Sequence, residues 1–108
     1  KLKNFVIIRT RFFNKNKIKF STAANDSFSS SIEVNKLAVY IIFLIKKNFN
    51  GIINVGGDKI SDYDLYKKYK HITLCKHIDI QKKLKFKISK NSSMNIKKLK
   101  KITHKYEF

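Results

Sequence analysis

The 108-residue sequence predicts a single α/β domain in which short parallel strands alternate with helices. Two observations support this prediction. The strand-like segments are short apolar runs, and helix-like segments with their own apolar spacing lie between them. Parallel strands cannot pair without a crossover connection, which this alternation supplies. The expected order is strand, loop, helix, strand, helix, weak strand, helix.

The first strand is expected at Phe5-Val6-Ile7-Ile8, a continuous run of β-branched and aromatic residues. Such a run is typical of a strand that is buried on both faces. The polar and basic residues 14–19 predict a loop. Residues 21–31 are small and rich in hydroxyl groups, without a clear period, and predict a loop that lies over other parts of the fold.

The strongest periodic signal predicts a helix after this loop. Asn35 can cap its start, or Ser30 and Glu33 can form a capping box that begins it earlier. Lys46 suits its C-terminal end, where a cation is favourable. Its inward face is expected to hold Val34, Leu37, Ala38, Ile41, Leu44 and Ile45.

The opposite face of this helix is apolar as well. It carries Tyr40, Ile42 and Phe43. A helix that is apolar all round is usually buried on more than one side. The sequence therefore predicts that the helix, like the first strand, needs cover on two sides.

A second strand and a short helix are expected next. Residues 51–55 form an apolar run, and the pair Gly56-Gly57 predicts a tight turn out of it. Ser61 is the expected N-cap of the helix, with Asp62 and Asp64 in its first turn, where carboxylates complement the helix dipole.

The C-terminal part is more basic and less regular. Residues 71–80 alternate only partly and weakly predict a strand, and residues 82–91 predict a basic loop. Ser92 or Ser93 is the expected cap of a last helix. The apolar residues of that helix, Ile96, Leu99 and Ile102, are spaced three residues apart.

The charge is strongly basic: 25 Lys and Arg against 7 Asp and Glu give a net charge of +18. Such a charge attracts polyanions without reading their sequence. Only Arg9 and Arg11 are arginine, the side chain best suited to recognising base edges. We therefore expect non-specific nucleic-acid binding at most, and the alternative function is a small basic nucleic-acid-binding protein without catalytic activity.

The remaining composition points to a reducing compartment and no membrane role. The single cysteine cannot form an internal disulfide. The longest apolar run, residues 37–45, is far shorter than the roughly 20 residues that cross a bilayer. A cytoplasmic location is expected.

No complete catalytic or metal site is visible in the sequence. Gly56-Gly57 lacks the spacing of a dinucleotide turn, and no phosphate-loop lysine follows it. His71, Cys75 and His77 lie close together, but a closed zinc site requires a fourth ligand. The sequence predicts no catalytic residue and no metal.

Several segments, in order, resemble the C-terminal half of sugar-nucleotide reductases of the extended short-chain dehydrogenase class, the dTDP-dehydrorhamnose reductase-like family. The resemblance lies in Val6-Ile7-Ile8-Arg9-Thr10 with Arg11-Phe12-Phe13 and in Val34-Asn35-Lys36-Leu37-Ala38. It also lies in residues 49–65, with the strand Gly51-Ile52-Ile53-Asn54-Val55-Gly56-Gly57 and the helix start after it, and in residues 91–99, which begin Asn91-Ser92-Ser93. It implies the C-terminal part of a Rossmann-like fold, with a basic substrate-side loop region.

The resemblance also implies that cofactor binding and substrate binding belong to different parts of the complete enzyme. Residues 1–108 would be one partial domain, and the glycine-rich dinucleotide turn and the catalytic Tyr-x-x-x-Lys would belong to an N-terminal half that the chain lacks. NAD(P) is implied for the complete enzyme, and no cofactor for this part alone. The implied substrate-binding residues for the sugar nucleotide are Arg11, Phe12, Lys87 and Asn91: Phe12 faces the sugar with Arg11 beside it, and Lys87 meets the diphosphate as a point charge.

Three hypotheses remain: a substrate-side reductase part that is inactive alone, a basic nucleic-acid-binding module, and a degenerate remnant that folds poorly. They differ in one structural expectation. A part made to lie against a larger sheet leaves the first strand unpaired on one side and exposes the outer face of the residue 37–45 helix. An independent basic domain covers both.

Overall fold

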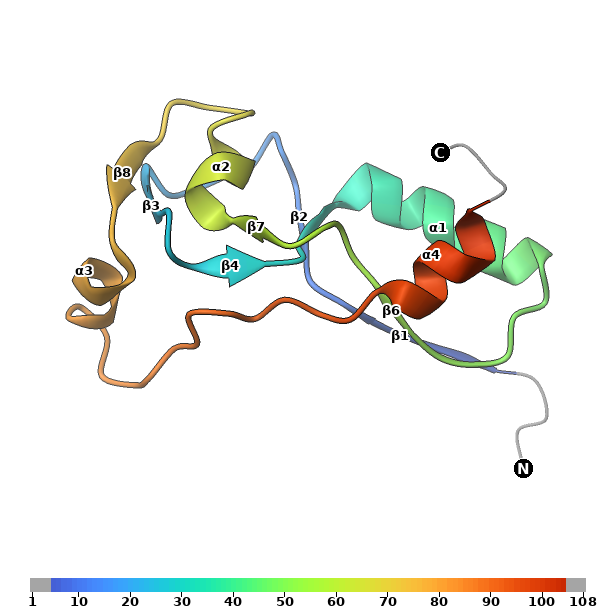
Figure 1. Ribbon diagram of the computed structural model, residues 1–108. Helices are drawn as coiled ribbons and strands as arrows, with labels where there is room; N and C mark the ends of the chain where they lie inside the picture. The colour runs from blue at the N-terminus through green and yellow to red at the C-terminus, as the bar shows by residue number, and fades with distance from the viewer. Residues whose placement is uncertain (1–4, 105–108) are drawn as a thin grey trace.

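The computed structural model describes residues 5–104, which form an elongated α/β fold of 46 × 29 × 22 Å (Figure 1). Its elements in chain order are β1 (Val6–Thr10), β2 (Phe12–Phe13), β3 (Thr22–Ala24), β4 (Phe28–Ser29), β5 (Ile32–Glu33), α1 (Val34–Lys46), β6 (Gly51–Val55), β7 (Ile60–Ser61), α2 (Asp62–Tyr66), β8 (Thr73–Cys75), α3 (His77–Gln81) and α4 (Lys97–Thr103). The predicted mixed α/β class with short parallel strands is confirmed.

β1 and β6 form a parallel pair joined by the crossover helix α1. The register runs from Val6 opposite Gly51 to Thr10 opposite Val55. Both strands lie where the apolar runs predict them. In the described part of the chain, β1 and β6 have only each other as neighbours, so each has one unpaired edge.

The region predicted as a loop, residues 21–31, contains the two short strands β3 and β4 instead, and β5 follows it directly. β3 pairs with β8 in parallel, β4 pairs with β7 antiparallel, and β5 pairs with β2 in parallel. Each of these strands has two or three residues, too few to show an alternating pattern. Their partners are also remote in sequence, so no local turn signal marks them.

The main core lies on one face of the β1–β6 pair. Helices α1 and α4 cover this face (Figure 1). Its buried members are Ile32, Leu37, Leu44, Ile53, Val55 and Leu99. On the other face, Ile7 is 50% exposed and Ile52 is 43% exposed. The expectation that the first strand is buried on both faces is therefore wrong for the described residues, because only one layer of helices covers the pair.

The N-cap of α1 is Glu33, rather than Asn35 or Ser30. The Glu33 carboxylate accepts a 2.7 Å hydrogen bond from the Asn35 amide, which satisfies a free donor of the first turn. The Ser30 hydroxyl lies before the helix start and accepts the Met94 amide at 2.9 Å instead. The helix ends near the expected residue, and Asn48 adopts the left-handed conformation that follows it.

The buried face of α1 is rotated relative to the predicted one. Leu37 and Leu44 are buried as expected, but Ala38 is exposed and Ile45 is 61% exposed. Tyr40 and Phe43 pack against the core in their place. The helix is apolar on both faces, as predicted, and its outer face carries Val39, Ile42 and Ile45, all exposed.

A smaller core surrounds α2. Ser61 caps this helix, accepting the Asp64 amide at 3.1 Å, which confirms the predicted N-cap. The Tyr66 ring is buried and contacts the Phe13 and Phe20 rings edge-on, with centroids 5.3 Å and 4.6 Å away. The other buried members are Ala23, Leu65 and Ile72. This core fixes the residues that follow β1 against the residues that precede α3.

The predicted strand at residues 71–80 is only partly present, since β8 is followed by the short helix α3. The first turn of α3 is stabilised by Asp79, whose carboxylate accepts the Lys76 amide at 3.1 Å. The predicted caps Ser92 and Ser93 are also wrong. α4 begins later, at Lys97, whose amide donates to the Asn95 side chain at 3.0 Å.

Gly56 allows two parts of the chain to meet. A Cβ atom at Gly56 would lie 2.5 Å from the backbone oxygen of Ser30. The neighbouring Gly57 donates its amide to the same oxygen at 2.9 Å. The glycine pair therefore serves close backbone packing at the end of β6. None of the helices within residues 5–104 combines the length and the apolar character that crossing a membrane requires.

Candidate functional site

The candidate site begins where β1 ends. Arg11 follows the last residue of β1, and its Nη1 donates a 2.8 Å hydrogen bond to the hydroxyl of Ser92. Ser92 directly follows Asn91, which the resemblance implies as a substrate-binding residue. The Ser92 hydroxyl in turn donates to the Phe28 carbonyl at 3.3 Å. The fold thus joins Arg11 to the residue after Asn91, 81 positions away.

Asp62 is the acidic member of the site, a residue that sequence analysis assigned only to the first turn of α2. Its carboxylate accepts a 3.2 Å hydrogen bond from the buried Ser29 hydroxyl. Burial raises the pKa of Asp62, while the Ser29 hydrogen bond and the positive charge of Arg11 act in the opposite direction. Its position after a serine N-cap hides this role, because the same pattern serves an ordinary helix start.

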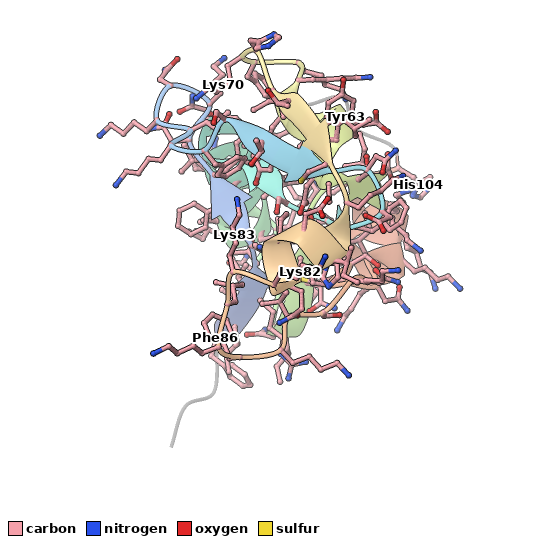
Figure 2. All side chains as sticks on the ribbon, turned by 90° about the vertical axis from the view of Figure 1, so that its left-hand side faces the viewer. Tyr63, Lys70, Lys82, Lys83, Phe86 and His104 are labelled. Carbon is pink, nitrogen blue, oxygen red and sulfur yellow. The ribbon has the colours of Figure 1, made fainter. Side chains whose placement is uncertain are left out.

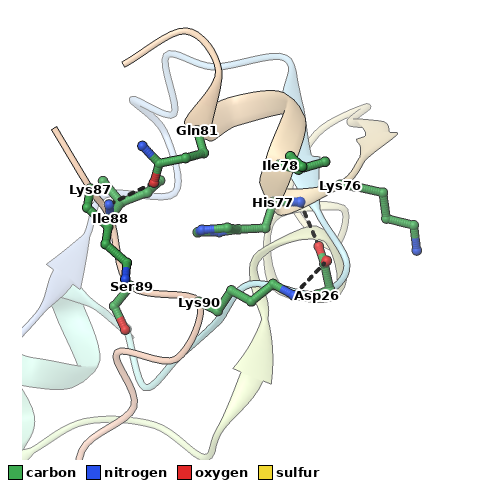
Figure 3. Close-up of a pocket in the computed structure, with 9 residues that line it drawn as sticks. All are labelled: Asp26, Lys76, His77, Ile78, Gln81, Lys87, Ile88, Ser89 and Lys90. Carbon is green, nitrogen blue, oxygen red and sulfur yellow. Dashed lines mark hydrogen bonds and ion pairs between the residues drawn. The ribbon is translucent and has the colours of Figure 1, made fainter. Parts of the chain in front are cut away.

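Arg11 and Asp62 line a cavity of about 390 Å³, together with Ser89 and Ser92. We call it the Arg11 cavity. Next to it lies a larger cavity of about 930 Å³, the Lys87 cavity (Figure 3). Ile88 and Ser89 line both, so the two are neighbours. The structure therefore places Arg11 and Lys87 at adjoining cavities.

The other two predicted substrate-binding residues line neither of these cavities. Phe12 belongs to β2, and its side chain is 58% exposed. Asn91 is exposed, and its side-chain oxygen accepts hydrogen bonds from the amide of Ser93 at 3.1 Å and from the Ser93 hydroxyl at 2.6 Å. Asn91 thereby shapes the turn that presents Ser92. Ligand contact by all four residues stays a prediction.

Several serines of the site region are buried, which the sequence pattern does not predict, and one of them, Ser27, lines the Arg11 cavity. Ser27, Ser29, Ser30, Ser31 and Ser61 are all buried. The hydroxyls of Ser27, Ser29 and Ser30 hydrogen-bond to groups from distant segments, namely the His77 ring, the Asp62 carboxylate and the Met94 amide. Buried hydroxyls require such partners. The hydroxyl-rich composition of residues 21–31 is the signal that could indicate this burial, because serine hydroxyls can be buried once they are hydrogen-bonded.

The trio His71, Cys75 and His77 does not form a metal site. No cluster of three His, Cys, Asp or Glu side chains suited to a metal occurs among residues 5–104. His71 is exposed, whereas His77 is buried and bonded to Ser27. Burial raises the pKa of the half-buried Cys75 thiol, which keeps it in its less reactive protonated form.

The chemistry available at the two cavities is anion binding. Arg11 offers a guanidinium, Lys87 an ammonium, and Ser89 and Ser92 hydroxyls. Charge-assisted hydrogen bonds from such groups are the strong contacts of phosphate recognition. The one carboxylate of the Arg11 cavity, Asp62, is held by Ser29 and disfavoured in its charged form by burial.

The site has the position expected of an α/β protein with a parallel sheet. Arg11 follows the carboxyl end of β1, and Gly56 follows the carboxyl end of β6. In open α/β sheets, ligands bind in the crevice beyond the carboxyl ends of the strands. Fold and site together define the chain as an α/β protein with a candidate anion site of this class.

Solved structures identify the fold more narrowly, as that of part of the dTDP-4-dehydrorhamnose reductases. A hypothetical dTDP-4-dehydrorhamnose reductase from Sulfolobus tokodaii is similar with a TM-score of 0.62 and 24% identity, over 90% of this chain and 41% of that one. The reductase from Yersinia enterocolitica has a TM-score of 0.65 at 15% identity, over 91% and 42%. The reductase from Bacillus anthracis, in complex with NADP, has a TM-score of 0.65 at 15% identity, over 94% and 42%.

This likeness confirms, at the level of the fold, the resemblance that the sequence predicts. The chain spans about two fifths of the length of these structures. No protein-family model and no curated protein sequence matches it.

Proposed function

We propose that this chain is the substrate-side part of an NAD(P)-dependent sugar-nucleotide reductase, inactive without a dinucleotide-binding part. One observation carries the proposal. The anion site lies beyond the carboxyl end of β1, while β1 has an open edge and an open apolar face on which a further part of the sheet can pack. This is the arrangement expected of a domain that is completed by more sheet.

The apolar surfaces support the same proposal. Ile7 and Ile52 are opposite each other in the β1–β6 register, on the face that no helix within residues 5–104 covers. On the far side of the main core, Ile42 and Ile45 of α1 are 53% and 61% exposed. Large apolar side chains that cluster on a surface usually mark an interface. The dinucleotide-binding part, in the same polypeptide or a separate one, would cover the Ile7 and Ile52 face.

The proposed roles in the site are those of substrate binding. Arg11 and Lys87 hold the diphosphate of the sugar nucleotide, Phe12 faces the sugar, and Asn91 holds the turn that presents Ser92 to Arg11. The guanidinium of Arg11 suits a two-point contact with phosphate, whereas Lys87 acts as a point charge. The reaction proposed for the completed enzyme is reduction of a keto-deoxysugar.

The cofactor would be held elsewhere. The Bacillus anthracis reductase is a complex with NADP. In this chain the backbone oxygens of Ser30 and Ser31 occupy the space beside Gly56 and Gly57. That space is therefore closed to a dinucleotide pyrophosphate. NAD(P) therefore belongs to the dinucleotide-binding part, and the described residues contribute substrate contacts alone.

A chimaera tests this proposal. Residues 5–104 replace the matching segment of the Sulfolobus tokodaii protein, and NADPH oxidation is measured with dTDP-4-dehydrorhamnose. We expect turnover in the chimaera, at least about tenfold less turnover when it carries Arg11→Met, and none in the host without the segment. A folded chimaera without turnover would overturn the proposal.

The nucleic-acid alternative rests on charge. Every lysine among residues 5–104 is exposed, and basic side chains such as Lys70, Lys82 and Lys83 extend from the surface (Figure 2). This function predicts binding that weakens steeply with salt and responds to any lysine equally. The cavities with defined polar contacts favour the reductase proposal over this alternative.

A further inference from the structure

His77 is a buried side chain that the proposed substrate contacts do not include. It is the first residue of α3 and is only 7% exposed. Its backbone amide donates a 2.7 Å hydrogen bond to the Asp26 carboxylate, which fixes the start of the helix. The imidazole lines the Lys87 cavity and points into it (Figure 3).

The orientation of the imidazole is set by Ser27. The Ser27 hydroxyl lies 2.8 Å from Nδ1 of His77, and both side chains are buried. Ser27 is itself held, because its carbonyl accepts the Asp62 amide at 2.8 Å. A hydrogen bond to one ring nitrogen fixes the direction of the other. Nε2 of His77 is therefore the polar ring atom left to face the cavity.

The charges around the cavity favour an anion. Three lysines line it: Lys76, Lys87 and Lys90. Asp26 is the one carboxylate among the described lining residues, and it is engaged by Lys90 at 3.7 Å and by the His77 amide. Lys90 is paired with Asp26, and the Lys76 ammonium donates to the Asn25 side chain at 2.9 Å. Lys87 is therefore the lining cation whose charge is available to an entering anion.

The walls of the cavity also have an apolar part. Ile78 and Ile88 line it, and Ile88 continues into the Arg11 cavity. At about 930 Å³ the cavity has the volume of a site for a small organic molecule rather than for an inorganic ion alone. An organic phosphate combines the two features, with an anionic group for the lysines and an apolar body for the isoleucines.

We infer that the Lys87 cavity binds an organic phosphate, with Nε2 of His77 contacting a phosphate oxygen from inside and Ser27 holding the ring. This inference deepens the proposed function and rests on it, since the phosphate is taken to be that of the sugar nucleotide. Lys87, at the rim of the cavity, binds the same phosphate through its ammonium group. His77 is a binding residue and Ser27 a positioning residue.

The ring resonances of the three histidines provide a direct test. The ¹⁵N-labelled full chain is titrated with pyrophosphate and, separately, with dTDP. His71 and His104 are exposed, line neither cavity, and serve as internal references. We expect the His77 ring signals to shift saturably with both probes while those of the references move by less than about a tenth as much. Equal, non-saturating shifts of all three would overturn the inference.

Variants separate the contacts within the site. We expect His77→Gln and Lys87→Met each to weaken dTDP binding about tenfold, the effect of losing one charge-assisted contact. Lys85→Met is the matched control, since Lys85 is exposed and lines neither cavity, and its affinity is expected within twofold of the parent. Equal weakening by Lys85→Met and Lys87→Met would show attraction by net charge and overturn the inference.

The role of Ser27 has its own readout. We expect Ser27→Ala to weaken dTDP binding about threefold and to broaden or split the His77 ring signals, because the ring loses its anchor. Ser27→Thr keeps the hydroxyl and is expected to restore both. If the Ser27→Ala protein binds and gives the parent His77 spectrum, Ser27 does not position the ring.

Failure of this inference is distinguishable from failure of the proposed function. Saturable binding at His77 with an inactive chimaera would refute the reductase function and leave the phosphate site. If the chimaera is active but the His77 ring signals do not shift with pyrophosphate or dTDP, the phosphate site at His77 is refuted and the proposed reductase function stands.

Discussion

The Arg11 guanidinium donates a 2.8 Å hydrogen bond to the Ser92 hydroxyl and thereby joins the end of β1 to the segment that leads into α4. This contact closes one side of the Arg11 cavity, which both residues line. A guanidinium has five N–H donors, so Arg11 keeps further donors for a ligand after one N–H bonds to Ser92. The hydrogen bond therefore orients Arg11 without using up its capacity to bind an anion.

Replacing Arg11 tests whether that orientation matters for binding. We expect Arg11→Lys to weaken dTDP binding about tenfold, because an ammonium keeps the charge and loses the planar donor pair. Ser92→Ala is expected to cost only about threefold, since it removes an anchor and leaves the guanidinium. Isothermal titration calorimetry measures both. Arg9→Lys is the control, and an equal loss in that variant would refute the role of Arg11.

Asp62 and Asp64 are expected to titrate in opposite directions although they are two residues apart. Burial raises the pKa of Asp62 above the reference value of 3.8. The Lys67 ammonium and the Ser61 hydroxyl hold the pKa of Asp64 below it. Carboxyl ¹³C shifts followed against pH would show Asp64 titrating first as the pH rises. The reverse order would contradict the burial of Asp62 in the site.

The same shifts predict how stability depends on pH. Because the pKa of Asp62 is raised in the folded state, the folded protein holds the proton of this carboxyl more tightly than the unfolded chain does. The resulting contribution to stability is complete below pH 3.8 and is lost as the pH rises through the pKa of Asp62 in the folded protein. Asp62→Asn should therefore gain stability relative to the parent as the pH increases across that window. Asp64→Asn should do the opposite, because the contribution of Asp64 is lost as the pH falls below 3.8. Urea unfolding between pH 3 and pH 7 measures both trends.

The sequence predicts the long elements of this fold and misses the short ones for a physical reason. The apolar periodicity of residues 34–46 is enough to place α1, and the apolar run of residues 51–55 is enough to place β6. Strands such as β4 and β7 are fixed instead by partners more than thirty positions away. Their two-residue length leaves no pattern in the sequence.

The faces of α1 were harder to predict than its length. An all-apolar helix has no polar side to indicate its rotation. Tyr40 and Phe43 therefore pack inward where Ala38 and Ile45 were expected.

The candidate site was predicted in part by the family resemblance and hardly at all by local pattern. The resemblance implies Arg11 and Asn91 as site residues, and the fold brings Arg11 into contact with Ser92, the residue after Asn91. Asp62, Ser27 and His77 were missed as site residues because their contacts come from tertiary structure. A serine and a histidine 50 positions apart carry no local signal that they bond.

Gly56 tests the packing that places the end of β6 against residues 30–31. A methyl group there would lie 2.5 Å from the Ser30 backbone oxygen, which cannot move without shifting the chain. We expect Gly56→Ala to lower the free energy of unfolding by about 2–4 kcal/mol. Gly57→Ala is the matched control, with a contact of 3.1 Å to Ser31, and should cost less than about 1 kcal/mol. Similar losses in the two variants, measured by urea unfolding, would contradict this close approach.

The two faces of α1 provide the last prediction, which separates internal packing from an external interface. Leu44 is 1% exposed in the main core, so Leu44→Ala should lower the free energy of unfolding by about 2–5 kcal/mol. Ile42 and Ile45 face outward, and the double variant Ile42→Ser/Ile45→Ser should change it by less than about 1 kcal/mol, since serine and isoleucine have similar helix propensities.

The outer face should nevertheless matter for association. An exposed apolar stripe favours self-association of the isolated chain, so the Ile42→Ser/Ile45→Ser variant should sediment with less oligomer than the parent at the same concentration. In the chimaera, the same variant should lower the thermal stability if the host covers this face and leave it unchanged if the host does not. A variant that loses as much stability as Leu44→Ala in the isolated chain would show that Ile42 and Ile45 are internal, and the outer face of α1 would then not be available to a partner.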